Sequence, residues 1–315
     1  MLKRIAIGLV VVFVCSALVI GVYSDATAQS AKAKIILKKY PAFKIGLLAN
    51  DFIKPLPLSK DNMKKVMDWA SANGFAWIEI RDPNATLTYA ECKELAAYAI
   101  TKKIEVIYAL NIGPLDPQFN EVFYRGCANA ALFAANGPRV IRSSLPGPEF
   151  NADPKKSVWV KDEFDKMLAI VNNAANVASS FGLTFVLEHA YEAQQGDGTS
   201  TFGIVEVLTK GNSNIGSQYD LANFFAVSRA PVSPDAAKWY FDKFAYKTGY
   251  VHVKTSKKGV VQDVLSDNDL DFGVIFDILA KAKIYYLGIE LPQQATFEAE
   301  AKNILKSVDY LKSKY

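Results

Sequence analysis

Short apolar runs alternate with amphipathic segments along most of the chain. The apolar runs have the length and β-branched content of buried strands, and they cover residues 44–50, 76–81, 104–111, 139–146, 184–189, 215–221, 249–254 and 285–291. Apolar residues at helical spacing follow each run. They predict helices over residues 59–73, 88–102, 120–136, 161–181, 201–210, 272–283 and 296–312, with a further helix that begins at 233–234.

This strict alternation of strands and helices limits the fold class. It implies a parallel sheet with right-handed crossovers, and eight strand–helix units in a chain of this length fit a closed α/β barrel, a (β/α)₈ TIM barrel, better than an open sheet. No glycine-rich nucleotide-binding motif or phosphate loop follows any predicted strand. The sequence therefore predicts a barrel over residues 44–315, preceded by an N-terminal linker over residues 29–43.

The first 28 residues have the pattern of a secretory signal peptide. A basic start, Met1 to Arg4, precedes an uncharged apolar run from Ile5 to Val22, and Ala26-Thr27-Ala28 has the small-x-small pattern of a cleavage site. The mature chain is then expected to begin at Gln29 and to be periplasmic or secreted, with contact to a membrane only through the signal. An uncleaved anchor is the alternative, because about 20 apolar residues can span a bilayer.

The composition of the chain limits the classes of molecule that it is expected to bind. The chain is 50% hydrophobic and 22% charged, and its formal net charge of +4 becomes +3 when the signal, which holds Lys3, Arg4 and Asp25, is removed. This small, unclustered surplus argues against a nucleic-acid partner. Cys92 and Cys127 remain after cleavage; free buried thiols are favoured over a disulfide, which stays an alternative. Whether copies of the chain associate as a homo-oligomer is left open by the sequence.

Four potential metal ligands stand near the carboxyl ends of four different predicted strands. They are Glu188, Asp220, His252 and Glu290. In a TIM barrel these ends meet at one face, and a buried carboxylate there costs several kcal/mol unless a cation or hydrogen-bond donors meet it. Each residue alone has an ordinary explanation, such as an ion pair, a turn cap or a core histidine. Together they predict a mononuclear site for a divalent metal ion.

Several motifs carry a family resemblance. GFAWIEIR, VLEH, YDLAN, YVHVK, DFGVIFDIL and GIEL, spread over residues 44–315, resemble the sugar phosphate isomerase/epimerase family, which has the xylose isomerase-like TIM barrel. The resemblance implies one divalent ion, with Mn²⁺ first and Mg²⁺, Co²⁺ or Zn²⁺ as alternatives, held by Glu188, Asp220, His252 and Glu290. It also implies that the two glutamates, Glu188 and Glu290, are catalytic and move a proton.

The sequence departs from the family at two positions. Asn223 stands where family epimerases often have a histidine, and Thr255 stands where many members have an aspartate after H-x-K. The related endonuclease branch needs a histidine-rich trinuclear zinc site, whereas this chain holds only His189 and His252. The resemblance therefore does not extend to DNA repair, and the substrate contacts of known sugar epimerases do not transfer directly.

A small-molecule carbohydrate is the expected ligand. The residues expected to bind it come from the loops and strand ends at the same face, and they are Arg142, His189, Asn223, Lys254 and Lys258. Glu79 and Arg81, at the end of the second predicted strand, are further candidates at the mouth of the barrel.

The predicted function is that of an exported, metal-dependent sugar isomerase or epimerase that abstracts a proton next to a metal-bound carbonyl. One alternative is a lyase or hydrolase that acts on 3-keto-glycosides with the same metal site. A second alternative is a non-catalytic sugar-binding barrel. A glycosidase with paired carboxylates is less favoured because it would not use the metal ligands.

The signal peptide gives the first testable prediction. We expect the exported protein to begin near Gln29, because the Ala-Thr-Ala pattern directly precedes it. The intact mass of the exported protein measures this. A mass that still includes residues 1–28 would contradict cleavage and favour the uncleaved anchor.

Overall fold

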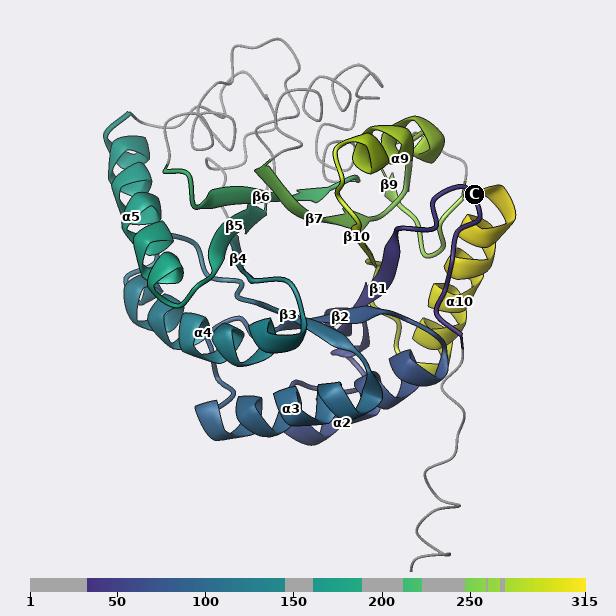
Figure 1. Cartoon of the computed structure of the whole chain (residues 1–315), viewed down its shortest axis with the longest axis horizontal. Coiled ribbons are helices and arrows are strands. Elements are labelled where there is room, and N and C mark those ends of the chain that lie inside the picture. Colours follow the sequence, from purple (N-terminus) through teal and green to yellow (C-terminus); the bar gives the residue numbers. More distant parts are fainter. Residues whose placement is uncertain (1–32, 145–160, 189–211, 223–246, 259, 267–269) are drawn as a thin grey trace, which may run out of the picture. The chain divides into compact units, whose positions relative to one another are not determined.

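Eight parallel strands close into a barrel, and the helices between them lie outside it (Figure 1). The computed structural model describes residues 33–144, 161–188, 212–222, 247–258, 260–266 and 270–315. The barrel strands pair in the order β1-β10-β7-β6-β5-β4-β3-β2. Their bounds are Lys44–Leu48 (β1), Trp77–Arg81 (β2), Glu105–Ala109 (β3), Val140–Ser144 (β4), Thr184–Glu188 (β5), Ile215–Asp220 (β6), Thr248–Val253 (β7) and Tyr286–Ile289 (β10). The predicted (β/α)₈ fold is confirmed, and each strand ends within two residues of its predicted bounds.

The described helices are α2 (Lys60–Ala72), α3 (Tyr89–Lys102), α4 (Phe119–Phe133), α5 (Lys161–Ser180), α9 (Phe272–Lys281) and α10 (Phe297–Lys314), with 3-10 turns η1 (Ala49–Phe52) and η2 (Ala134–Asn136). Helices α2, α3, α9 and α10 each begin at a side chain that caps the helix. The Ser59 side chain accepts a hydrogen bond from the backbone at the start of α2, and Thr88 forms a capping box with Glu91 at the start of α3. The helices predicted over 201–210 and from 233 lie outside the described residues.

Side chains inside the barrel form two layers. The lower layer is apolar and buried, and its large members are Trp77, Ile107, Val186 and Tyr250. Alternate residues of a strand point to the same side of the sheet, so the next inward positions on β2, β5 and β7 are Glu79, Glu188 and His252. The sequence pattern thus puts a polar layer above an apolar floor, at the carboxyl ends of the strands.

Trp77 fills the floor because two glycines leave room for its ring. Gly46 is paired in register with both Trp77 and Gly288 on the neighbouring strands. A Cβ atom at Gly46 would lie 2.3 Å from the Trp77 ring, and one at Gly288 would lie 2.7 Å from it. The indole Nε1 donates a hydrogen bond of 2.9 Å to the carbonyl oxygen of Lys44. Trp77 is therefore both packed and hydrogen-bonded at the closed end of the barrel.

The N-terminal segment and a hairpin add to the predicted fold. Residues 33–43, which the sequence assigned to a linker, lack helix and strand, but Leu37, Tyr40 and Phe43 are buried in the core between the sheet and the helices. A short hairpin, β8 (Ser256–Lys257) and β9 (Val260–Val261), follows β7 and was not predicted. In the described part of the chain, this hairpin forms a two-stranded sheet of its own, separate from the barrel.

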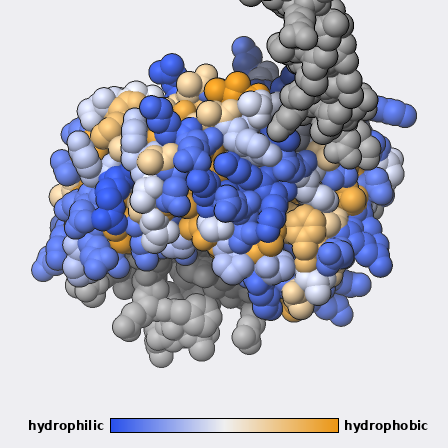
Figure 2. Space-filling view, turned by 90° about the horizontal axis from the view of Figure 1, so that it is seen from below, coloured by the Kyte–Doolittle hydropathy of each residue, from blue (hydrophilic) through white to orange (hydrophobic). Residues whose placement is uncertain are grey.

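The state of the two cysteines agrees with the prediction from composition. Cys92 and Cys127 are free and buried, as favoured, and burial raises the pKa of each thiol to about 12. Hydrophilic side chains cover most of the face in Figure 2, with hydrophobic ones scattered among them. No helix in the described part of the chain is long and apolar enough to cross a membrane.

Replacing Gly46 with Ala should destabilise the barrel, because the added methyl group would overlap the Trp77 ring. Overpacking of this kind costs about 1–3 kcal/mol. Chemical denaturation of both proteins measures the loss in free energy of unfolding. The same substitution in a Trp77→Phe background should cost less, since the smaller ring leaves space. An equal loss in both backgrounds would contradict the contact.

Candidate metal centre

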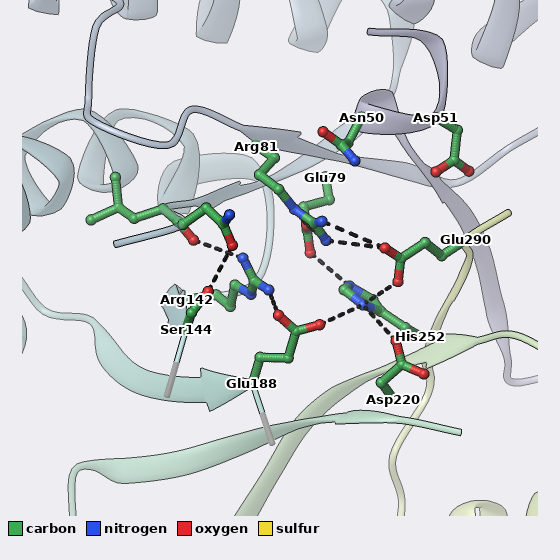
Figure 3. Close-up of polar contacts among 12 residues, drawn as sticks. Asn50, Asp51, Glu79, Arg81, Arg142, Ser144, Glu188, Asp220, His252 and Glu290 are labelled. Carbon is green, nitrogen blue, oxygen red and sulfur yellow. Dashed lines mark hydrogen bonds and ion pairs between the residues drawn. The ribbon is translucent and has the colours of Figure 1, made fainter. Parts of the chain in front are cut away.

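The four predicted ligands come together in the upper layer. Glu188 and Asp220 end β5 and β6, His252 lies near the end of β7, and Glu290 directly follows β10. One donor atom from each of the four residues lies within 4.8 Å of the others (Figure 3). Parallel strands in register produce this convergence: Glu188 pairs with Gln218 two residues before Asp220, and Asp220 pairs with His252.

The two ring nitrogens of His252 face different partners. Nε2 lies 2.9 Å from Glu79 Oε2. Three carboxylate oxygens face Nδ1, at 2.9 Å (Glu290 Oε2), 3.8 Å (Asp220 Oδ2) and 3.9 Å (Glu188 Oε1). A histidine that donates one N–H to a carboxylate has its other nitrogen oriented as a metal ligand. Glu79 therefore holds His252 with Nδ1 toward the other three ligands.

Contacts within the polar layer shift the pKa values of His252 and Glu79. Burial by itself would lower the pKa of His252, but attraction to Glu79 and Glu290 outweighs it and raises the pKa to about 10. Burial would raise the pKa of Glu79, but His252 and Arg81 outweigh that effect and lower it. Tyr250 adds a hydrogen bond of 2.6 Å from its hydroxyl to Glu79 Oε2. Glu79 is consequently a charged, fully buried anchor.

Three further cations lie among the acids. Arg81 contacts Glu79 at 3.0 Å and Glu290 at 3.5 Å, while Arg142 contacts Glu188 and donates to the Leu110 carbonyl oxygen at 2.7 Å. Lys254 Nζ lies 2.8 Å from both Asp220 Oδ2 and Glu290 Oε2. With His252 protonated, four positive groups balance the four carboxylates Glu79, Glu188, Asp220 and Glu290.

The donor set fits a divalent metal ion. Three carboxylate oxygens and one imidazole nitrogen form a mixed site of the kind that binds Mn²⁺, Mg²⁺, Co²⁺ or Zn²⁺. His252 Nδ1 and Glu290 Oε2 are buried and lie 2.9 Å apart, and Lys254 Nζ is the cation 2.8 Å from the same Glu290 oxygen. An ion between such atoms would satisfy both of them.

Comparison with solved structures defines the fold class. No family model and no curated protein matches the sequence. A xylose isomerase-like TIM barrel protein from Mycobacterium smegmatis, in complex with magnesium, matches with a TM-score of 0.61 at 15% identity over 86% of this chain and 97% of that one. The fold is the xylose isomerase-like TIM barrel.

Two sugar epimerases share this fold with the chain. An L-ribulose 3-epimerase has a TM-score of 0.59 at 17% identity, covering 85% of this chain and 90% of that one. The 3-keto-D-glucoside 4-epimerase YcjR from E. coli, in its apo form, has a TM-score of 0.59 at 16% identity, covering 86% and 99%. At these identities the comparison establishes the architecture alone.

The residues expected to bind substrate have different positions in this xylose isomerase-like barrel. Arg142 is fully buried and faces Glu188 rather than an open ligand position. Lys254 forms ion pairs with Asp220 and Glu290. Lys258 is exposed, in the β8–β9 turn with a positive φ of 52°. His189 and Asn223 lie outside the described residues.

Three residues around this site are more important than the sequence indicated. Glu79 and Arg81 were secondary candidates, and Tyr250 was not considered. The signal was the two-residue alternation in WIEIR and YVHVK, which places Glu79, Arg81, Tyr250 and His252 on the inward side. Asp51, in η1, is a further buried acid near Glu290 (Figure 3).

Removing the imidazole should abolish metal binding without unfolding the barrel. We expect His252→Ala to fold and to lose most of its bound divalent ion, because a strand-end ligand contributes more to the site than to the core. Melting temperature with and without Mn²⁺, together with metal content, measures this.

Gln218→Leu is the matched control for His252→Ala, since Gln218 is equally buried and lies one inward position below Asp220. It should keep its metal-dependent rise in melting temperature. Stoichiometric metal in folded His252→Ala would show that His252 is not a ligand.

Proposed function

We propose that this chain is a divalent-metal-dependent sugar isomerase or epimerase that moves a proton next to a carbonyl group. The observation that carries the proposal is the position of Glu188 and Glu290 on either side of His252 (Figure 3), within one group of four potential ligands. Two carboxylates on opposite sides of a bound sugar are the arrangement that removal and return of a proton require.

In the proposed reaction, the metal ligands and the two glutamates have different roles. A divalent ion, when bound, would polarise the carbonyl and an adjacent hydroxyl of the sugar and so acidify the C–H bond between them. Glu188 contacts Arg142 and, at a greater distance, His252. Burial would raise the pKa of Glu290, but Lys254, His252 and Arg81 outweigh it and lower that pKa. We assign removal and return of the proton to these two glutamates, one on each side of the sugar.

The identity of the ion is part of the proposal. The structural neighbour from Mycobacterium smegmatis contains magnesium, and the donor set, with one imidazole nitrogen among carboxylate oxygens, suits Mn²⁺ as the first choice. Mg²⁺, Co²⁺ and Zn²⁺ are the alternatives. Neighbours that act on free ketoses, such as D-psicose 3-epimerase with D-tagatose, support an unphosphorylated sugar as the substrate.

Location favours the same class of substrate. The signal-like residues 1–28 point to a periplasmic or secreted protein, and sugar phosphates are scarce outside the cell membrane. A second candidate is a lyase or hydrolase that acts on 3-keto-glycosides, which begins with the same proton abstraction. The neighbour described as a 3-keto-D-glucoside 4-epimerase supports this candidate.

The mechanism predicts an isotope effect. A substrate deuterated at the carbon beside the carbonyl should react more slowly or exchange its label with solvent. Glu188→Gln and Glu290→Gln should each lower kcat by about 10²- to 10⁴-fold, the usual contribution of a general base. Free ketoses and 3-keto-glycosides with Mn²⁺ are the substrates to screen, and metal content is measured for every variant.

Two outcomes would contradict the mechanism. Wild-type rates in both metal-loaded Gln variants would exclude the two glutamates as bases. Sugar binding without turnover of any carbonyl sugar by the metal-loaded wild type would instead favour a non-catalytic sugar-binding barrel.

A further inference from the structure

Lys254 lies in the metal-ligand group, although it cannot itself be a ligand while it carries a proton. It directly follows β7, two residues after His252, so both side chains point to the inside of the barrel. Its Nζ is 2.8 Å from Asp220 Oδ2 and 2.8 Å from Glu290 Oε2, and its side chain is 15% exposed. These are two of the three carboxylate oxygens that face His252 Nδ1.

We propose that Lys254 is a resident cation of the ligand group, which a divalent ion must displace in order to bind. The inference rests on the proposed metal site but not on the proposed reaction. Two oxygens that share one ammonium group at 2.8 Å are close enough to share a metal ion, which binds carboxylate oxygens at about 2.0–2.6 Å. The ammonium and the ion therefore compete for Asp220 and Glu290.

Charge makes the competition strong. An ammonium group and a divalent ion repel each other, and at this depth water screens the repulsion poorly. Binding of the ion must also break two ion pairs whose carboxylates are almost fully buried, since Asp220 is 0% and Glu290 6% exposed. Lys254 thus lowers the affinity for the metal, while it keeps the acidic oxygens together before the metal arrives.

The flexible stem of lysine makes displacement feasible. Four rotatable carbons separate the ammonium group from the backbone at the end of β7, so Nζ can leave the two oxygens without any movement of the strand. Arg81 and Arg142 differ in this respect, because each is held by other groups: Arg81 by Glu79, and Arg142 by the Leu110 carbonyl oxygen. Lys254 is the cation of the three that can yield its place.

Calorimetric titration of Mn²⁺ into the metal-stripped full chain tests the proposal. Lys254→Met should bind Mn²⁺ at least about tenfold more tightly than the wild type, since the loss of a buried competing charge exceeds the 1.4 kcal/mol that corresponds to tenfold. Its melting temperature without metal should fall, and the rise caused by Mn²⁺ should be larger.

Lys44→Met is the matched control. Lys44 also pairs with a carboxylate, Glu105, at 2.7 Å, but it lies at the first residue of β1, at the opposite end of the barrel. This variant should lose stability and keep the wild-type affinity for Mn²⁺. Lys254→Gln, which retains hydrogen-bond donors for both acids, replaces the Met variant if the latter does not fold, and the same increase in affinity is expected.

The outcomes separate the two proposals. Unchanged or weaker Mn²⁺ binding by the Lys254 variants, with clear binding by the wild type, overturns the competition and leaves the metal site intact. A tenfold gain in Mn²⁺ affinity in Lys44→Met as well would show that the loss of any positive charge strengthens metal binding. That result would also overturn the proposed competition by Lys254. Absence of Mn²⁺ binding by the wild type and all variants overturns the metal site, and the inference with it.

Discussion

Burial of four carboxylates in one layer of the barrel is the constraint on which the rest of this site depends. Glu79 and Asp220 are fully buried and Glu290 nearly so, and an unpaired charge at such a depth would cost several kcal/mol. The strands supply a compensating cation for every acid. The result is a set of ion pairs in which no member can be removed without leaving a partner charge uncompensated.

The same balance of charges bears on the neighbouring acid Asp51 and on the proposed metal site. Asp51 is a further buried acid near these four, and burial, together with repulsion from Glu290 and Glu300, raises its pKa well above the usual range. Under the proposed function, a divalent ion bound through neutral His252 would replace the positive charges of the imidazolium and of the displaced Lys254, so the four carboxylates would stay balanced.

The sequence predicts the barrel well because eight strand–helix repeats permit few other topologies. It also brings Glu188, Asp220, His252 and Glu290 together, since parallel strands end at one face. It does not predict that Arg142 faces Glu188, or that Lys254 bridges Asp220 and Glu290, because those pairs depend on strand register and side-chain rotamers. The packing of residues 33–43 was missed for a related reason: isolated apolar residues without periodicity give no strand or helix signal.

The apolar floor closes the site toward the amino-terminal ends of the strands. Trp77, Ile107, Val186 and Tyr250 are fully buried and fill the barrel beneath the polar layer, so nothing can reach the ligand atoms from the amino-terminal ends of the strands. Under the proposed function, an ion and a sugar would both enter from the carboxyl ends of the strands, and an ion bound by these ligands would enter first. A sugar bound above the ion would then trap it. Exchange of the ion should therefore slow down as the sugar concentration rises, which is the kinetic behaviour of a compulsory binding order.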